Sequence, residues 1–214
     1  MANDDNKKLM ILGAGLFLFF LSTRAKAGTT GGNGGVTIPG APGSLNESYL
    51  GIEPTATNRG IRNNNPGNIK FSRYNNWQGK VPEAQNTDAK VTDPQHSRFG
   101  QPTFEQNFTW AQGIRMMIHL IKNSYIPSGR NTINKIMDGI PAQNLGGWSA
   151  GNENYKNHLA TKTGKTRTQT ISATDEATIK NLIIAMANFE NGHTGPNDID
   201  VIHSDSYDTA RTLL

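Results

Sequence analysis

The sequence predicts a mainly helical α+β domain that includes a small β-hairpin. The segments Ala111–Tyr125 and Ser172–Glu190 both repeat apolar residues at spacings of three and four, the pattern of an amphipathic helix. Apolar residues between Ile69 and Val81 flank a polar loop at Ser72–Asn76, which favours a short hairpin although the alternation is poor. A small hairpin among about five helices is an α+β arrangement.

The first 27 residues are expected to form a membrane anchor or a signal segment. Leu9–Leu21 contains thirteen residues without a polar side chain, with lysines before it and Arg24 and Lys26 after it. A helix of this length covers about 20 Å, less than the roughly 30 Å hydrocarbon core, but flanking cations can snorkel to the interface. A cleaved signal peptide is the alternative, because Ala25-Lys-Ala27 has the small-x-small pattern of a cleavage site.

Residues 28–57 are expected to link this segment to a folded domain at 58–214. Gly28–Gly43 is rich in glycine and proline and cannot bury apolar area, so it should be flexible. Its root-mean-square reach as a random coil is about 20–24 Å. Such a tether suits an enzyme that searches a nearby surface, although a plain spacer between domains would have the same composition.

The domain opens with an asparagine-rich turn within Asn58–Phe71. Three consecutive asparagines precede Pro66-Gly67, a combination that disfavours the middle of a helix. Asn65 should be extended because it precedes proline, and Gly67 permits positive φ. We expect the turn to hold its amide side chains outward, where their donors and acceptors suit acetamido and hydroxyl groups of sugars. A purely structural turn is the alternative.

Two shorter helices follow the first long one. Thr132–Met137 is predicted as a helix with Asn131 as its N-cap and a stop at Gly139-Ile-Pro141. Asn152–Thr161 reads as another short helix, which carries Tyr155 and begins close to Glu153. The dipole at a helix start should lower the pKa of Glu153, which suits an electrostatic or substrate-binding role, or simply an exposed acid.

Glu190 has the most informative position among the acidic residues. It continues the apolar stripe of Ser172–Glu190 and lies in the last turn, since Asn191-Gly192 is a typical helix stop. The negative end of the helix dipole and partial burial should both raise the pKa of its carboxyl group. A general acid that protonates a glycosidic oxygen near neutral pH needs this setting. Alternatively, Glu190 caps a buried amide or pairs with Arg59 or Arg62.

Composition excludes several classes of function. Cysteine is absent, so disulfides, thiol nucleophiles and zinc-thiolate sites are excluded. The net charge of +4 suits an anionic surface such as a cell wall or a membrane, and it is equally compatible with nucleic acid. No Lys/Arg run reaches five residues, so a nucleic-acid-binding arm is not indicated and no nucleic-acid partner is predicted. His193, Asp198, Asp200 and His203 lack the spacing of a zinc-protease motif, so no metal is expected. The chain contains no phosphate-binding loop and no Gly-x-Ser-x-Gly elbow, so no cofactor is expected.

The segment Arg59-Gly-Ile-Arg-Asn-Asn-Asn-Pro-Gly-Asn-Ile69 resembles the opening signature of a family of phage virion proteins. That family is described as lysozyme-like, with suspected lytic transglycosylase activity on peptidoglycan. The Trp-Ala-Pro that the resemblance leads us to expect after Ile136 is absent, and Asp138-Gly-Ile-Pro141 and a displaced Trp148 follow instead. This difference leaves undefined the shape of one wall of the sugar-binding groove that a lysozyme-like fold implies. Further family-like features occur in the same order: Trp77-Gln-Gly79, Gly113-Ile-Arg115, Thr132 with Ile136, Asn154-Tyr155 and Phe189-Glu-Asn-Gly192.

The resemblance implies a lysozyme-like domain that cleaves peptidoglycan to aid phage entry or exit. It assigns Glu190 as the catalytic acid, with Glu153 as a second candidate. Contacts to the glycan are expected from Arg62, Asn64, Asn65, Asn68 and Tyr155. The implied partners are peptidoglycan, a membrane through the N-terminal segment, and other virion proteins. The implied location is the virion, or the periplasm or cell exterior after export. A non-catalytic virion protein that only binds glycan is the main alternative, and a secreted wall-binding module is a further one.

Overall fold

Helices carry most of the regular structure in the computed structural model, which describes residues 59–195 and 198–214. A single two-stranded antiparallel sheet accompanies them among these residues, with Gly139 opposite Gly146 and Ile140 opposite Leu145. The expected α+β character is confirmed in this coarse form. The elements in order are α1 (Arg59–Arg62), η1 (Glu83–Gln85), α2 (Trp110–His119), η2 (Leu120–Tyr125), α3 (Ile133–Asp138), β1 (Gly139–Ile140), η3 (Pro141–Gln143), β2 (Leu145–Gly146), α4 (Glu153–Thr163), α5 (Glu176–Glu190) and α6 (Ser204–Arg211).

Helix α2 continues directly into the π-helix η2, and together they match the predicted helix Ala111–Tyr125. A capping box starts α2: the Thr109 hydroxyl accepts from the Gln112 N–H, and the Gln112 side chain accepts from the Thr109 N–H. The buried face of α2 includes Ile114, Met117 and Ile118. Because the π-helix widens the last turns, its residues point in directions that a regular α-helix would not give them.

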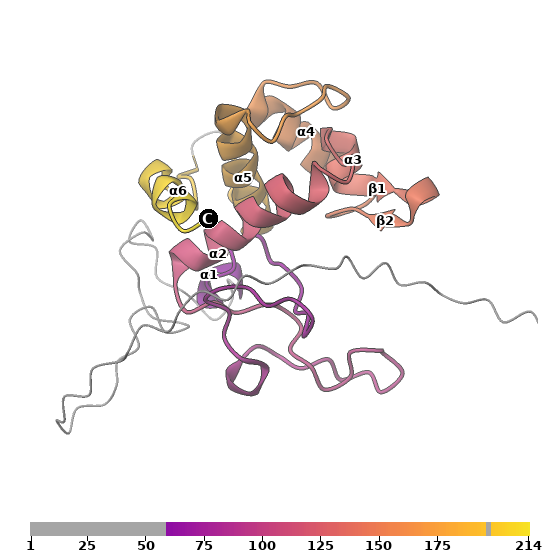
Figure 1. Cartoon of the computed structure of the whole chain (residues 1–214), viewed down its shortest axis with the longest axis vertical. Coiled ribbons are helices and arrows are strands. Elements are labelled where there is room, and N and C mark those ends of the chain that lie inside the picture. Colours follow the sequence, from indigo (N-terminus) through magenta and orange to yellow (C-terminus); the bar gives the residue numbers. More distant parts are fainter. Residues whose placement is uncertain (1–58, 196–197) are drawn as a thin grey trace, which may run out of the picture. The chain divides into compact units, whose positions relative to one another are not determined.

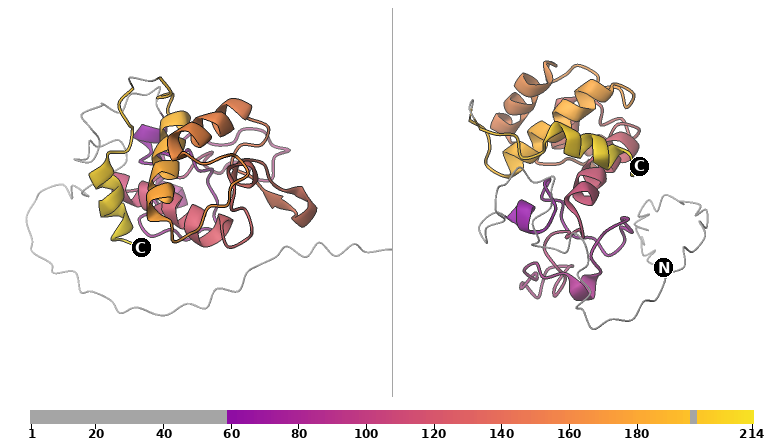
Figure 2. Two further views of the ribbon diagram at one scale, coloured as in Figure 1. Left: turned by 90° about the horizontal axis from the view of Figure 1, so that it is seen from above. Right: turned by 90° about the vertical axis from the view of Figure 1, so that its left-hand side faces the viewer.

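Helix α5 lies at the centre of the helical part and packs against α4 and α2, while α6 packs against α2 (Figures 1 and 2). The predicted stripe of α5 is confirmed, since Ile179, Leu182, Ile183 and Met186 are all fully buried. The Asp175 side chain caps the helix by accepting from the Thr178 N–H. The core therefore forms between helices that lie far apart in the sequence.

The shorter helices show both agreement and correction. Helix α4 begins after Asn152, whose side chain accepts from the Tyr155 N–H, as the prediction of a helix there requires. The N-cap of α3 is Thr132 rather than the predicted Asn131, because the Thr132 hydroxyl accepts from the Lys135 N–H. Helix α6 was not predicted. Its residues are mainly polar, and only a narrow face with Tyr207 and Ala210 is apolar and buried.

The predicted hairpin within Ile69–Val81 is wrong. Its two arms do not pair with each other; instead, Lys70 bridges to Phe104 and Lys80 bridges to Asn107. A further bridge joins Lys90 to Pro102, so one later segment pairs in turn with three earlier ones. The short sheet forms elsewhere, at β1 and β2, where the sequence suggested only a helix stop. Single bridges leave no regular alternation of apolar residues, which explains why this arrangement has no strong sequence pattern.

Asn63, Asn64 and Asn65 of the opening turn are buried in the protein rather than directed outward. Asn65 has no exposed surface; its amide donates to the carbonyls of Ile69 (2.9 Å) and Glu105 (3.0 Å) and accepts from the Ile69 N–H (3.0 Å). The side-chain amide of Asn64 donates to the backbone carbonyl of Asn107, and the side-chain amide of Asn107 donates to that of Asn64, both at 3.0 Å. The turn is therefore a structural junction, because these buried backbone groups need partners that the irregular segment 70–107 lacks.

Two glycines allow this junction to approach helix α2. A Cβ on Gly113 would lie 1.9 Å from the Asn64 carbonyl oxygen, so only glycine lets the helix contact the turn here. Gly67 has no positive φ, contrary to the expected reason for its presence; a Cβ there would crowd Met117 at 3.0 Å. Positive φ occurs instead at Asn64 and Asn68, a conformation that asparagine tolerates.

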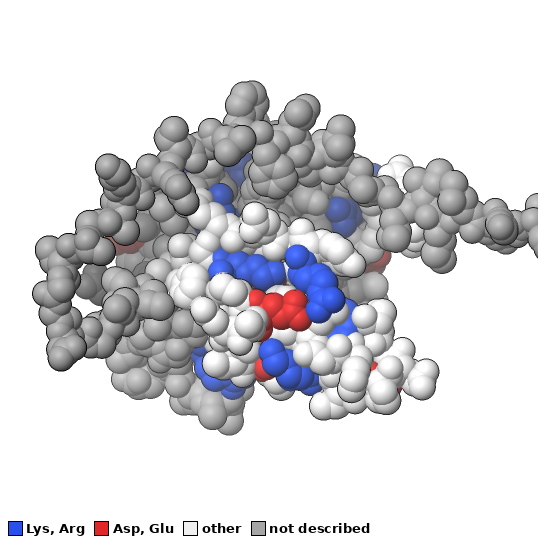
Figure 3. All heavy atoms as spheres, turned by 60° about the horizontal axis from the view of Figure 1, so that its bottom comes forward, with Lys and Arg blue, Asp and Glu red and all other residues white. Residues whose placement is uncertain are grey.

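Most of the segment 70–108 lies on the opposite side of α2 from α4 (Figure 1), whereas the end of α5 reaches the opening turn, where the Asn68 amide donates to the Glu190 carbonyl. On the face at the bottom of Figure 1, basic side chains surround a smaller acidic patch (Figure 3). The exposed pair Arg73–Glu83 in this segment has a contact distance of 2.8 Å. This face is therefore mixed in charge.

The predicted anchor, Leu9–Leu21, and the predicted linker, 28–57, lie outside the described residues. Across residues 59–195 and 198–214, no helix combines the length and apolar character needed to cross a bilayer.

Candidate functional site

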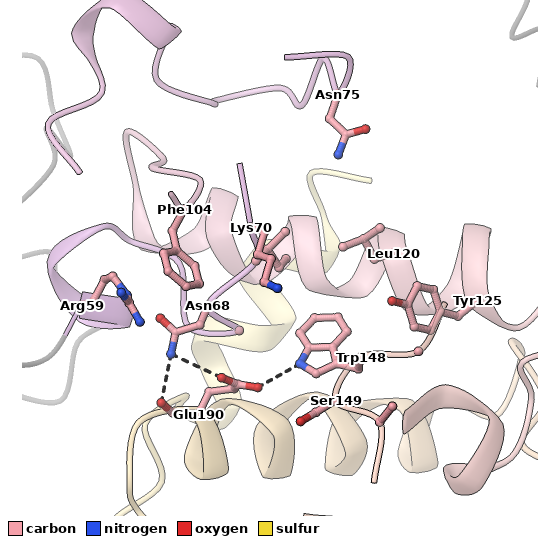
Figure 4. Close-up of a pocket in the computed structure, with 14 residues that line it drawn as sticks. Arg59, Asn68, Lys70, Asn75, Phe104, Leu120, Tyr125, Trp148, Ser149 and Glu190 are labelled. Atoms are coloured by element: carbon pink, nitrogen blue, oxygen red, sulfur yellow. Dashed lines mark hydrogen bonds between the residues drawn. The ribbon is translucent and has the colours of Figure 1, made fainter. Parts of the chain in front are cut away.

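A pocket of about 690 Å³ lies where the opening turn meets the end of α5 (Figure 4). Its walls come from α1 and the opening turn, the loop residue Asn75, Phe104, the π-helix η2, the loop after β2, and the last residue of α5. Its lining residues are Arg59, Gly67, Asn68, Ile69, Lys70, Asn75, Phe104, Leu120, Tyr125, Gly147, Trp148, Ser149, Ala150 and Glu190. The lining combines polar side chains with aromatic rings, and such a combination can bind and orient a ligand.

Glu190 contributes the carboxylate of this pocket. The Trp148 indole N–H donates to its Oε1 at 3.0 Å (Figure 4). The Asn68 amide donates to the Glu190 backbone carbonyl at 3.0 Å, with a longer contact of 3.4 Å to Oε2. The side chain is partly buried at the C-terminal end of α5. Three distant segments therefore converge on one carboxyl group.

The pKa of Glu190 is raised above the ordinary value for a glutamate. Burial of the carboxyl group is the main cause, because desolvation penalises the charged form. The hydrogen bonds from Trp148 and Asn68, the Tyr155 hydroxyl and the positive charge of Arg59 all act in the opposite direction, but they do not cancel it. This direction agrees with the pKa predicted from the position of Glu190 on the apolar stripe. A carboxyl group of this kind can hold a proton closer to neutral pH than an exposed one.

Aromatic rings form much of the wall beside Glu190. Tyr125, from η2, meets Trp148 edge-to-face with ring centroids 6.1 Å apart. The Arg130 guanidinium lies 3.6 Å from the centre of the Tyr125 ring and donates to the Gly146 carbonyl at 2.6 Å. On the other side, the Arg59 guanidinium lies 3.7 Å from the centre of the Phe104 ring. The contact between Trp148 and Glu190 could not be predicted from spacing, since 42 residues separate them.

Several predicted glycan-binding residues do not line the pocket. Asn64 and Asn65 are buried in the junction described above, so their amides are not available to a sugar. Arg62 contacts Asp88 at 3.3 Å. Tyr155 is also buried: its ring stacks on Phe189 with centroids 3.9 Å apart, and its hydroxyl donates to the Met186 carbonyl at 3.1 Å. The glycan contact expected from Tyr155 is thus wrong, because the ring is buried, and of the predicted contacts only Asn68 lines the pocket.

Glu153 lies outside the pocket at the start of α4. Its carboxylate is exposed and pairs with Lys156 and Arg167, both at 2.7 Å. The bond from Lys156, followed by that from Arg167, lowers the pKa of Glu153. The direction agrees with the prediction, but neighbouring cations supply the cause. A carboxyl group that stays ionised is a poor general acid near neutral pH.

Glu105 is a buried carboxyl group whose special environment no sequence pattern indicated. It has no exposed surface, and its Oε1 accepts from the Ser72 N–H (3.0 Å) and the Lys80 ammonium (3.2 Å). Burial raises the pKa of Glu105 more than the Lys80 charge lowers it. Because Lys80 also donates to the Asn75 carbonyl, this buried pair holds the loop that carries Asn75 to the pocket rim. Among the described residues, no group of three metal-ligating side chains occurs.

A comparison with known proteins finds a relative that is similar enough to show the family of this chain. No protein-family model matches the chain. Protein P5 of Pseudoalteromonas phage PM2 is 32% identical over 144 residues, which cover 65% of this chain and 76% of Protein P5. The matched region of 144 residues is much longer than the opening signature, so the relationship does not depend on a short motif. The chain therefore belongs to the phage protein family that includes Protein P5 of phage PM2.

Proposed function

We propose that the chain is a virion-associated enzyme that degrades peptidoglycan, with Glu190 as the general acid of a lytic transglycosylase. One observation carries this proposal: a partly buried carboxyl group with a raised pKa lies in an open pocket with aromatic walls. Exposed surface acids do not have this combination, and buried structural acids such as Glu105 do not line the pocket. The lysozyme-like resemblance of the opening signature supports the same reaction class.

The reaction needs only one carboxyl group. Glu190 gives its proton to the glycosidic oxygen while the bond from that oxygen to the sugar C1 breaks. The resulting carboxylate then takes the proton of the 6-hydroxyl of the same sugar as that oxygen bonds to C1. An anhydro-sugar end forms, Glu190 regains its proton, and no water is consumed. The N–H groups of Trp148 and Asn68 stabilise the carboxylate between the two proton transfers. The absence of Glu153 from the pocket is thus compatible with this chemistry.

The rest of the pocket suits a sugar that carries acetamido groups. Asn68, Asn75 and Ser149 offer amide and hydroxyl groups for hydrogen bonds. Trp148 and Tyr125 offer aromatic surface against which the apolar face of a sugar ring can pack. The family relationship to a phage protein supports a location in the virion. The apolar segment Leu9–Leu21 supports attachment to a membrane there.

A zymogram on purified cell wall tests the proposal, with the products examined for anhydro-muramic ends. The parent protein should clear the wall, and Glu190→Gln should lose at least about 10²–10⁴-fold in rate, because it keeps the shape but cannot transfer a proton. Glu83→Gln is the matched control, since it removes a carboxylate that does not line the pocket and pairs with the exposed Arg73. Glu153→Gln tests the other predicted acid. Equal rates for Glu190→Gln and the parent would contradict the assignment.

A non-catalytic virion protein is the second candidate function. The observation that favours it is the Asn68 amide, which binds both the backbone carbonyl and the carboxylate of Glu190. These contacts join the opening turn to the end of α5 and would serve a purely structural role equally well. A parent protein that binds cell wall but releases no fragments from any peptidoglycan would support this alternative.

A further inference from the structure

The pocket contains more positive charge than the proposed chemistry uses. Its ionisable lining residues other than tyrosine are Arg59, Lys70 and Glu190. The proposed acid must be protonated when the substrate binds, and in that state the pocket has two positive charges and no negative one. A glycan with only hydroxyl and acetamido groups would leave both charges uncompensated.

The two cations differ in their surroundings. Arg59 lies over the Phe104 ring at 3.7 Å and lowers the pKa of Glu190, so it already acts on groups of the protein. Lys70 is exposed, and within residues 59–195 and 198–214 its ammonium has neither an ion pair nor a hydrogen bond. By contrast, the exposed Arg73 is paired with Glu83. Lys70 is thus the cation that remains free for a ligand.

The backbone fixes the position of Lys70. It bridges to Phe104 and directly follows Ile69, whose N–H and carbonyl are both bound by the Asn65 amide. Figure 4 shows the Lys70 side chain directed into the pocket, toward the space between Asn68 and Trp148. A ligand atom that reaches Glu190 along this side must therefore pass the ammonium group.

We propose that Lys70 binds an acidic substituent of the glycan and makes the pocket selective for carboxylate-bearing strands over neutral ones. This inference rests on the proposed function and specifies its substrate. The group bound is a carboxylate, such as that of a lactyl substituent joined by an ether bond to alternate sugars. The contact is a charge-assisted hydrogen bond from the Lys70 ammonium to this carboxylate. Because Lys70 is exposed, salt should weaken its contribution.

The test measures binding by calorimetry in the Glu190→Gln background, in which no glycan is cleaved and the neutral amide imitates the protonated acid. Three probes differ in charge: glycan strands without peptides, which carry free lactyl carboxylates; the same strands after conversion of those groups to methylamides; and chitohexaose. We expect the free-acid strands to bind most tightly. Lys70→Gln should weaken their binding by about threefold to tenfold at low salt and leave the two neutral probes unchanged. Lys70→Arg should restore it.

Lys135→Gln is the matched control, because it removes the same charge from an exposed site on α3 outside the pocket. Equal losses for Lys70→Gln and Lys135→Gln, or equal affinity for acidic and neutral strands, would overturn the role of Lys70 while the proposed reaction stands. If the parent neither cleaves cell wall nor binds any of the three probes, the proposed function fails, and this inference fails with it.

Discussion

Replacing Asn65 with alanine should destabilise the fold without any ligand being involved. Three hydrogen bonds disappear, but their loss is unequal. The Ile69 carbonyl still accepts from the Glu105 N–H at 2.9 Å, whereas the Glu105 carbonyl and the Ile69 N–H lose their only hydrogen-bond partners within residues 59–195 and 198–214. Each buried group left without a partner costs about 1–3 kcal/mol. The two groups together therefore give an expected loss of about 2–6 kcal/mol in the free energy of unfolding.

A loss of this size should lower Tm by on the order of 10 °C, since about 1 kcal/mol corresponds to 2–4 °C in a domain of this length. Urea unfolding, monitored by circular dichroism, measures the loss in the free energy of unfolding, and a thermal scan measures the change in Tm. Asn75→Ala is the matched control: it removes an amide from the pocket rim that makes no side-chain hydrogen bond among the described residues, and should stay within about 0.5 kcal/mol. An Asn65→Ala protein with an unchanged Tm but a lost affinity for glycan would refute the structural role of Asn65.

Three further predictions concern Glu190, Trp148 and the N-terminal segment. Because burial raises the folded-state pKa of Glu190, the stability from this group is present below the unfolded pKa and is lost as pH rises through the folded pKa. The Tm of Glu190→Gln should therefore rise relative to that of the parent between pH 4 and pH 7.5. A constant difference in Tm across that range would contradict this prediction. Trp148→Phe removes a donor that lowers the pKa of Glu190, so the alkaline limb of the pH–rate profile should move to higher pH; a shift to lower pH would count against the assigned contact. The full chain should stay with the membrane fraction after alkaline carbonate extraction through Leu9–Leu21, and recovery of uncleaved soluble protein would exclude an anchor.

Sequence periodicity was sufficient for the elements whose apolar residues follow one face. The stripe of α5 predicted both the helix and the semi-buried position of Glu190, because the angle per residue fixes which side chains share a face. The polar helix α6 was missed for the same reason, since its short buried face leaves little periodic signal. The opening turn was located correctly, but the amides of Asn63, Asn64 and Asn65 are buried rather than directed outward.

The predicted outward direction of the asparagine side chains in the turn was wrong because local chemistry does not determine which way an amide points. Asparagine bonds equally well to solvent, to a sugar or to a buried carbonyl. The deciding fact is that residues 101–107 run beside the turn with backbone groups that lack regular strand partners, as the Asn64–Asn107 exchange illustrates. Trp148 was missed as a pocket residue for a similar reason, since its contact with Glu190 depends on tertiary packing rather than on spacing.

The span of the contacts at Glu190 has a consequence for biosynthesis. Asn68 and Glu190 are separated by 122 residues, and the turn, the aromatic wall and the π-helix all precede α5. A ribosome releases the chain from its N-terminus, so every wall of the pocket emerges before the carboxyl group does. Contacts across such separations form late in folding. A nascent chain thus holds no assembled acid until α5 docks, and the proposed lytic activity begins only when synthesis of this region is complete.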